Sequence, residues 1–395
     1  MSFIGRRSVG HPAEAGMVEE DKTCDFAVIG AGIAGASVAA ELVAYGSVML
    51  LEMESQPGYH TTGRSAALFS ESYGPAPIRA LSRASAHFFD HPPEGFSSHR
   101  LLTPRGVAMI ARDDQLDALD ALIEELSDAR DIVRLDAAQT RERIPLLREG
   151  YAAGAMYDER SRDIDVHALH QGFLRAFRAG GGKIETRLEV TGLARDGAGW
   201  TIETTNGVFR SAVVVNAAGA WADQIGALAG AAPIGLVPKR RTAMTIAAPD
   251  GVHADSWPMA VDVEEAFYLK PESGRFLISP ADETPSQPCD AQPDEMDVAI
   301  CIDHIEKAFD MHVRRVENKW AGLRSFVADK SPVCGYDGAK QGFFWLAGQG
   351  GYGIQTSPAL ARLAANLVTG RAVDSFILDE GLDPASLSPE RLSTR

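Results

Sequence analysis

The stretch from Asp25 to Glu52 constrains the fold of this chain more than any other. It reads D-F-A-V-I-G-A-G-I-A-G-A-S-V-A-A-E-L-V-A-Y-G-S-V-M-L-L-E. The apolar run at residues 26–29 predicts a buried parallel strand, residues 37–44 have helical spacing of apolar side chains, and residues 47–51 predict a second strand. We therefore expect a β-α-β unit of a mostly parallel sheet.

Three glycines in this stretch follow the G-x-G-x-x-G spacing. Gly30 allows a tight turn, Gly32 lets the backbone approach a pyrophosphate, and Gly35 lets the helix pack closely on the strand. The helix N-terminus offers N–H groups and a partial positive charge to phosphate. Glu52 lies near the spacing expected of an acid that binds ribose hydroxyls. Together these features predict a dinucleotide-binding fold.

The length and composition narrow the class of protein. The 395 residues accommodate two domains, and the net charge of -16 argues against nucleic acid or an anionic membrane as the main partner. The uncharged run 26–40 is too short to span a membrane, so no transmembrane segment is expected. Four scattered cysteines form no C-x-x-C, which predicts no disulfide framework or metal site and fits a reducing cytoplasm: Cys24, Cys289, Cys301 and Cys334.

We interpret residues 1–22 as a flexible leader. Arg6 and Arg7 resemble the start of an export signal, but the segment 11–23 that follows is polar and acidic instead of apolar. Met17 lies just before the first strand and is an alternative start to Met1.

Two further regions carry sequence signals for ligand binding. The Gly/Ser/Thr-rich loop 56–67 directly follows Glu52, and its backbone amides and polar side chains are expected to wrap a diphosphate and a ring system. Near the end, a buried strand at 342–347 leads into a second glycine-rich turn, 348–358, and a helix predicted over 360–368 with Ser357-Pro358 as cap and first turn. Two glycine turns so far apart in sequence predict a large ligand touched at both ends.

Between these regions the sequence pattern changes to short strand-like segments separated by turns. From residue 235, short strand-like segments at 241–246, 266–270 and 275–279 alternate with turns. This pattern predicts an antiparallel sheet, inserted in the first domain as a second one. A loop rich in Pro, Asp and Glu interrupts it at 281–295.

Seven motifs occur in order along the chain. They are G-Y-H-T-T-G-R-S-A-A (58–67), D-I-D-V-H-A-L-H-Q-G (163–172), V-N-A-A-G-A-W (215–221), P-K-R-R (238–241), F-Y-L-K-P (267–271), W-A-G-L-R-S-F (320–326) and Q-G-G-Y-G-I-Q-T (349–356). With the first glycine motif they extend from about residue 25 to near the C-terminus. The chain resembles the flavoenzyme family of D-amino acid oxidases, glycine and sarcosine oxidases and D-amino acid dehydrogenases, and within it D-arginine dehydrogenase.

The resemblance implies a mixed α/β fold with a Rossmann-like FAD-binding domain and an inserted antiparallel-sheet substrate domain. We expect the FAD-binding domain to comprise residues 23–104, 156–218 and 323–395. The substrate-binding domain would comprise residues 105–155 and 219–322.

The resemblance also implies a noncovalent FAD. Cys334 does not match the attachment position of covalent relatives, so we interpret it as a structural thiol. The residues expected to contact FAD are Gly30, Gly32, Ala34, Gly35, Glu52, Met53, Thr61, Thr62, Gly63, Arg64, Ser65, Ala66, Ala67, Leu68, Val190, Gly219, Gly350, Gly351, Tyr352, Gly353, Ile354 and Gln355.

The substrate site is implied in the same way. Arg241 and Arg324 match a pair that clamps a substrate carboxylate, a task that suits guanidinium because it forms bidentate bonds. Tyr268 matches a hydroxyl that adds to the clamp, and Tyr73 matches a tyrosine that closes the pocket. The carbonyl of Gly351 would accept a hydrogen bond from the substrate amine.

Two departures from D-arginine dehydrogenase bear on the substrate. Leu68 stands where that enzyme has a histidine, and Val107 stands where it has the glutamate that binds the substrate guanidinium. Both replace polar groups by apolar ones, so we expect apolar D-amino acids as substrates. Glu71 is a possible substitute carboxylate, because in an extended chain it points the same way as Tyr73.

The sequence thus predicts an FAD-dependent dehydrogenase that oxidises the CH–NH2 group of a D-amino acid. Hydride would pass from the α-carbon to the flavin, and the imino acid would hydrolyse to a 2-oxo acid and ammonia. The strand 276–279 lacks the lysine that promotes reaction with oxygen in sarcosine oxidase-like relatives, so we expect an acceptor such as a quinone. The alternatives are oxidation of N-methyl amino acids or 2-hydroxy acids, a non-catalytic flavin-binding protein, and a nicotinamide reductase, which the glycine turn at 348–353 disfavours.

Overall fold

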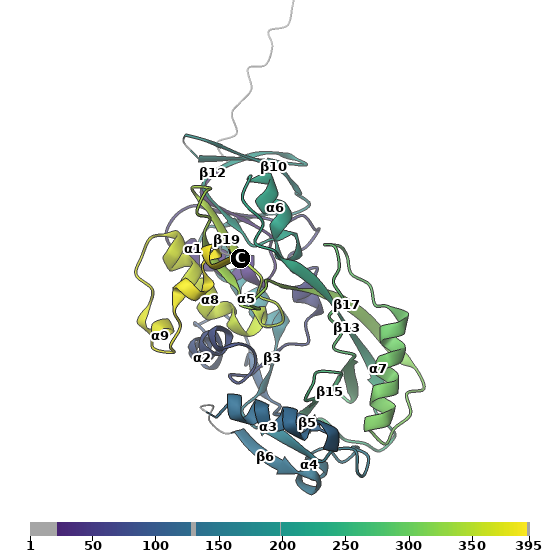
Figure 1. Ribbon diagram of the computed structural model, residues 1–395. Helices are drawn as coiled ribbons and strands as arrows, with labels where there is room; N and C mark the ends of the chain where they lie inside the picture. Colours follow the sequence, from purple (N-terminus) through teal and green to yellow (C-terminus); the bar gives the residue numbers. More distant parts are fainter. Residues whose placement is uncertain (1–21, 128–131, 198, 393–395) are drawn as a thin grey trace, which may run out of the picture.

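The structure, a computed structural model, describes residues 22–127, 132–197 and 199–392. The predicted leader therefore lies outside the described residues, apart from Lys22. The described residues form two large sheets, stacked one above the other in the view of Figure 1, and a small three-stranded sheet.

The first large sheet contains the predicted β-α-β unit. Its strand order is β10-β11-β12-β1-β2-β9, with β19 beside β12 and β18 beside β19. The parallel strands are β1 (Thr23–Ile29), β2 (Val48–Leu51), β9 (Lys183–Glu185), β12 (Gly207–Asn216) and β19 (Phe343–Ala347). The antiparallel strands are β10 (Val190–Asp196), β11 (Gly199–Thr204) and β18 (Val333–Tyr336).

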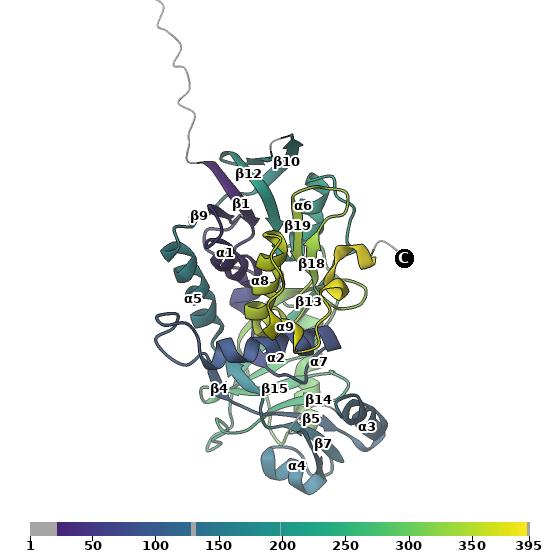
Figure 2. The same cartoon turned by 90° about the vertical axis from the view of Figure 1, so that its left-hand side faces the viewer.

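Helices cover both faces of this sheet, as Figure 2 shows from the side. One face packs against α1, α2, α5 and α8 through a large apolar core, and the other packs against α6. The bounds of these helices are α1 Ile33–Leu42, α2 Ala76–Asp90, α5 Val166–Ala179, α6 Ala222–Leu228 and α8 Gly353–Val368. Asp165 caps α5, because its carboxylate accepts a hydrogen bond from the N–H of Ala168 at 2.8 Å.

The second large sheet is antiparallel except for the pair β14–β5. Its order is β17-β13-β16-β15-β14-β5-β7-β6, with bounds β5 Val107–Ala111, β6 Ile132–Asp136, β7 Gly154–Asp158, β13 Val237–Ala247, β14 Met259–Asp262, β15 Tyr268–Glu272, β16 Arg275–Ser279 and β17 Val316–Phe326. One face packs against α7 (Glu295–Ala308). Two shorter helices, α3 (Leu116–Glu125) and α4 (Ala137–Arg143), lie at the end of the molecule near β6 (Figure 1).

The predicted mixed α/β fold, with a Rossmann-like part and an antiparallel-sheet part, is confirmed, whereas the exact domain boundaries stay a prediction. The strand β7 crosses the boundary expected at residues 155 and 156, and the whole of it joins the second sheet. The small sheet, β3 (Leu68–Phe69), β8 (Arg162–Ile164) and β4 (Leu102–Pro104), belongs to the segments that connect the two large ones.

The last long helix begins earlier than its sequence suggested. The prediction placed Ser357-Pro358 at its start, but α8 begins at Gly353 and contains Pro358 in its interior. A proline there leaves the carbonyl four residues earlier without its helical partner. The hydroxyl of Ser357 donates to that carbonyl, of Ile354, at 2.9 Å, which explains how the helix accommodates the proline.

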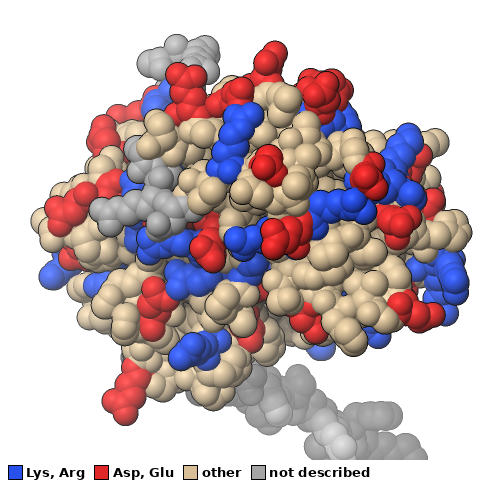
Figure 3. All heavy atoms as spheres, turned by 90° about the horizontal axis from the view of Figure 1, so that it is seen from below, with Lys and Arg blue, Asp and Glu red and all other residues tan. Residues whose placement is uncertain are grey.

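The described surface carries charges of both signs. On the face at the α4 end of the molecule, lysine and arginine side chains are interspersed with aspartate and glutamate (Figure 3). Among the described residues, no helix is both long enough and apolar enough to cross a membrane.

Candidate active site

A cavity of about 510 Å³ lies between the carboxyl ends of the first sheet and one face of the second. Nineteen of the predicted site residues line it. They are Gly30, Gly32, Ala34, Glu52, Met53, Thr61, Thr62, Arg64, Ser65, Ala66, Val190, Gly219, Arg241, Tyr268, Arg324, Gly350, Gly351, Gly353 and Ile354. The fold thus brings both glycine turns and both arginines to one cavity, although Gly30 and Gly353 are 323 positions apart in sequence.

One end of the cavity is built by the start of α1. The hydroxyl of Thr62 accepts a hydrogen bond from the N–H of Ile33 at 2.9 Å, and so caps this helix from the neighbouring loop. Glu52 is 7% exposed, and its carboxylate accepts from the N–H of Ala31 at 2.7 Å and from that of Glu54 at 2.9 Å. These bonds fix a carboxylate beside the helix N-terminus, where the prediction places ribose and diphosphate.

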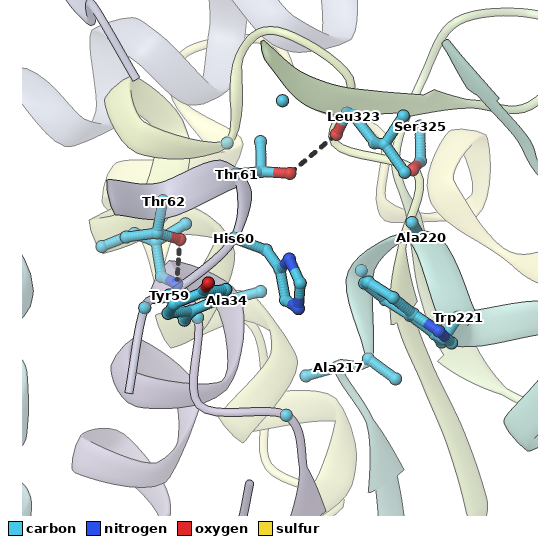
Figure 4. A pocket seen from close by; sticks show the side chains of 18 of the residues that line it. Ala34, Tyr59, His60, Thr61, Thr62, Ala217, Ala220, Trp221, Leu323 and Ser325 are labelled. Carbon is cyan, nitrogen blue, oxygen red and sulfur yellow. Dashed lines mark hydrogen bonds between the residues drawn. The ribbon is translucent and has the colours of Figure 1, made fainter. Parts of the chain in front are cut away.

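The polar loop after Glu52 connects the two large sheets. The hydroxyl of Thr61 donates to the carbonyl of Leu323 at 2.8 Å (Figure 4). Arg64 donates to the carbonyl of Ala321 at 2.9 Å, and the indole of Trp320 donates to the carbonyl of Arg64 at 2.9 Å. The loop is therefore fixed against β17, and its backbone forms part of the cavity wall.

Buried polar atoms in the cavity wall indicate a polar ligand. Among the described residues, Nδ1 of His60, Oγ of Ser325 and Nε2 of Gln349 are buried without a hydrogen-bond partner, and all three residues line the cavity. Unpaired buried polar atoms are costly, so such atoms commonly mark the place of a ligand or water. His60 and Trp221, whose ring centroids are 4.7 Å apart, face each other there (Figure 4). A long cavity with a helix N-terminus at one end and these groups in its wall fits FAD.

Strand register explains how the two arginines meet. On β13 and β17, Arg241 is opposite Gly322, and Arg324 is opposite Lys239. Because side chains alternate along a strand, Arg241, Arg324 and Lys239 share one face of the sheet, the face that lines the cavity.

The electrostatics of the arginine pair favour an anionic ligand. Arg241 is 7% exposed, and burial, followed by the charge of Arg324, lowers its pKa. Among the described residues, no carboxylate lies within ion-pair distance of Arg324, although Glu283 is 3.4 Å from Arg241. Two adjacent guanidinium groups whose positive charges are only partly balanced by nearby carboxylates can hold the carboxylate of a ligand between them.

The second glycine turn packs directly on this pair. A Cβ atom on Gly351 would lie 2.9 Å from Nη1 of Arg324, so the guanidinium packs closely on the backbone and would have to shift if a larger residue replaced this glycine. Tyr268, 7% exposed, packs beside Ala243 and Ala66 on the same face.

Seven predicted residues lie outside the cavity lining: Gly35, Gly63, Ala67, Leu68, Tyr73, Tyr352 and Gln355. Tyr73 nevertheless interacts with Arg324 through its side chain, and burial raises its pKa, so the phenol stays protonated at neutral pH. Its ring lies 5.0 Å from that of Tyr352. Gln355, in the first turn of α8, accepts a hydrogen bond from the N–H of Ser70 and donates one to the hydroxyl of Ser82. The roles assigned to these residues remain predictions.

Two acidic residues near the site were not singled out in the sequence. Glu265 lies in the turn before β15 with a φ of +57°, and its charge acts on Arg241, Arg324 and Tyr73. Glu283 lies in the loop that the sequence marked only as an interruption. Both residues come near the arginines through pairing between strands far apart in sequence, and such pairing leaves no local sequence signal. The sequence indicates the turn that contains Glu265, but not the position of this turn beside the arginines.

Comparison with known proteins adds independent evidence. The family model described as DAO, FAD dependent oxidoreductase, matches residues 25–367. Glycine oxidase of Geobacillus kaustophilus is 25% identical over 356 residues, 87% of this chain and 92% of the relative. Mitochondrial dimethylglycine dehydrogenase of Rattus norvegicus is 23% identical over 88% of this chain but only 44% of its own length. L-2-hydroxyglutarate dehydrogenase of Salmonella houtenae is 28% identical over 53% of this chain and 50% of its own.

Solved structures share the fold at low identity. The crystal structure of the Geobacillus kaustophilus glycine oxidase superposes with a TM-score of 0.80, at 23% identity, over 93% of this chain and 98% of that one. The L-amino acid deaminase of Proteus vulgaris gives a TM-score of 0.78 at 16% identity, over 99% and 100% of the two chains. The family model over residues 25–367 confirms the predicted family, while a particular closeness to D-arginine dehydrogenase stays a prediction. This chain belongs to the DAO family of FAD-dependent oxidoreductases and is an enzyme that uses FAD.

Proposed function

We propose that this enzyme oxidises the carbon–nitrogen bond of a D-amino acid whose carboxylate is held by Arg241 and Arg324. The observation that carries the proposal is the placement of both guanidinium groups on one face of the second sheet, at the wall of the cavity. Bidentate pairing with two arginines would fix the substrate in a single orientation.

The chain contributes positioning and charge stabilisation. When bound, FAD supplies the hydride acceptor. The arginine pair would orient the α-carbon, and Tyr268 and the protonated Tyr73 would add hydrogen bonds to the carboxylate. The carbonyl of Gly351 would accept from the neutral amine. No side-chain base is required in this scheme, because orientation and preorganised charge lower the barrier.

We further propose that FAD is held without a covalent bond. A covalent flavin link through Cys334 would require a reactive thiol. Cys334 lies in β18 and is 1% exposed. Burial raises its pKa, which leaves an unreactive neutral thiol. Cys334 is also absent from the cavity lining.

We propose that the enzyme prefers substrates with apolar side chains. Strand alternation places Val107, 8% exposed, on the same face as Arg241 and Tyr268. Its cross-strand partner Asp158 has a carboxylate that already accepts hydrogen bonds from three hydroxyl groups, those of Ser70, Ser72 and Ser161. A cationic side chain would therefore lose its hydration without gaining a free partner from either residue.

We expect kcat/KM to be higher for D-leucine and D-methionine than for D-arginine and D-lysine. Each buried methylene contributes only about 0.8 kcal/mol, so discrimination among apolar substrates should be small. A panel of D- and L-amino acids measures this preference and the stereochemistry together. Preference for cationic substrates by about tenfold (1.4 kcal/mol) would contradict the apolar pocket, and Glu71→Gln and Glu265→Gln would then identify the responsible carboxylate.

The dehydrogenase reaction is expected to be faster than the oxidase reaction. On β16, Leu277 packs in the same apolar cluster as Tyr268, and this strand contains no lysine. Lys270 on β15 is 6% exposed and is paired with Asp163 at 3.2 Å and Glu272 at 3.2 Å. We expect rapid reduction of a quinone or dye with little peroxide. Peroxide formation in air at the rate of substrate consumption would show an oxidase.

A second candidate substrate class is an N-methyl amino acid or a 2-hydroxy acid. Relatives named dimethylglycine dehydrogenase and L-2-hydroxyglutarate dehydrogenase support it, since both names imply a carboxylate that the same clamp would hold. Adding N-methylglycine, N,N-dimethylglycine and 2-hydroxyglutarate to the panel separates these classes from D-amino acids.

A further inference from the structure

The segment 282–286 continues the second sheet where β16 ends. The N–H of Arg240 donates to the carbonyl of Thr284 at 2.8 Å, and the N–H of Ser286 donates to the carbonyl of Pro238 at 2.9 Å. These bonds run along the first half of β13, the strand that carries Arg241. The position of each side chain in the segment is therefore set by backbone pairing with β13.

The two acids of this segment point to opposite faces. Asp282 lies on the α7 side, where its carboxylate is 3.3 Å from Nε of Arg240. Glu283 lies on the cavity side, where Oε2 accepts from Lys239 at 2.7 Å and Oε1 is 3.4 Å from Nη2 of Arg241. The alternation of acids thus matches the alternation of cations on β13.

The same segment holds the guanidinium of Arg241 at two of its nitrogens. Nε donates to the carbonyl of Asp282 at 3.0 Å, and Nη2 is directed at Glu283. In the part of the chain that the structure describes, no group bonds Nη1. This nitrogen remains available for a ligand, and its direction depends on the two anchors.

The charges around Glu283 support its role as an anchor. Burial acts to raise its pKa, but the hydrogen bond from Lys239 and the charges of Lys239, Lys330 and Arg241 outweigh it and hold the pKa below the usual value. Glu283 is therefore ionised at neutral pH. It opposes the repulsion among Lys239, Arg241 and Arg324, which share one face of the sheet.

We propose that Glu283 is a positioning residue that holds Arg241 in the orientation needed to bind the substrate carboxylate. The inference rests on the proposed carboxylate clamp and adds a residue that acts through it. Its length matters as well as its charge, because the backbone of the segment is fixed and only a side chain of this reach meets Nη2.

The test compares three substitutions of Glu283 in the holoenzyme. Two quantities are measured: KM and kcat for D-leucine, and the Kd of 4-methylpentanoate from the change in flavin absorbance. Glu283→Ala and Glu283→Asp should each raise KM and Kd by about tenfold, with kcat within about twofold of wild type. Glu283→Gln keeps the reach and an acceptor oxygen but loses the charge, so it should raise KM and Kd by less than Glu283→Asp does.

The ranking of the variants by KM and Kd separates a positioning role of Glu283 from other roles. If only charge mattered, Glu283→Asp would behave as wild type and Glu283→Gln would not, which would overturn the proposal. Lower KM and Kd in Glu283→Ala would make Glu283 a competitor of the substrate, and unchanged values would show no role. Glu272→Ala removes another glutamate paired with a lysine of the same sheet, at 3.2 Å, and should change neither quantity.

The Kd of 4-methylpentanoate also separates a failure of the positioning role of Glu283 from a failure of the carboxylate clamp. If wild type binds 4-methylpentanoate and all Glu283 variants bind it equally, only the positioning role is wrong. If wild type does not bind the carboxylate, the clamp itself is wrong and the positioning role falls with it. Flavin content and the thermal midpoint of each variant show whether it is folded.

Discussion

Replacing Arg324 by methionine should lower kcat/KM for the amino acid substrate by about 30-fold to several thousandfold. Truncating one partner of a buried, hydrogen-bonded charge pair costs roughly 2–5 kcal/mol, and each 1.4 kcal/mol is a factor of about ten. Arg324 faces the cavity beside Arg241 and lies against Gly351, so its loss would leave the substrate carboxylate with only one of the two guanidinium groups of the clamp. Steady-state kinetics with D-leucine measure the loss.

The control for this variant is Lys319→Met on the same strand. Lys319 is paired with Glu295 and lies outside the cavity lining, so its removal should leave kcat/KM unchanged. The Arg324 variant should keep its flavin and its fold. A folded, yellow Arg324→Met protein with kcat/KM close to wild type would refute the clamp.

The variant Gly35→Ala should prevent formation of a stable FAD-loaded protein. A Cβ atom at this position would lie 1.7 Å from the carbonyl oxygen of Gly30 and 3.4 Å from a methyl group of Val28. The obstructing atom is backbone, so the helix must move away from the strand. Overpacking commonly costs about 1–3 kcal/mol and more where nothing can yield. Flavin content and the thermal midpoint of the purified protein are the measurements.

Gly197→Ala is the matched substitution for this experiment. In the described part of the chain, no atom lies within 4 Å of the position of a new Cβ on Gly197, its chain neighbours aside, so this variant should keep both its flavin and its thermal midpoint. A Gly35→Ala protein with wild-type flavin content and thermal midpoint would contradict the close helix–strand packing described above.

The nucleotide-binding unit was the most predictable part of the chain. Its two strands are short apolar runs, and its helix is apolar, largely buried and bounded by glycine, so local composition determines each element. The observed bounds of β1, α1 and β2 differ from the predicted ones by a few residues. The helix α8 was less predictable, because Pro358 is a typical first-turn residue and only the hydroxyl of Ser357 makes an interior position acceptable.

The substrate side of the site could not be derived from local sequence. The meeting of Arg241 and Arg324 follows from the register of β13 and β17, which are separated by about 80 residues in sequence. Only the resemblance to a family suggested it. Neither the local sequence pattern nor the family resemblance indicated a role for Glu283. Its segment has the composition of a surface loop and acquires its position by pairing with β13.

Anaerobic titration of the purified protein with D-leucine decides whether this enzyme oxidises D-amino acids. Oxidation of the amino acid must reduce the bound FAD when oxygen is excluded, and the visible flavin absorbance then disappears. We predict complete bleaching with D-leucine, none with L-leucine on the same timescale, and one equivalent of ammonia per flavin. An unchanged flavin spectrum with every amino acid of both configurations would contradict the account.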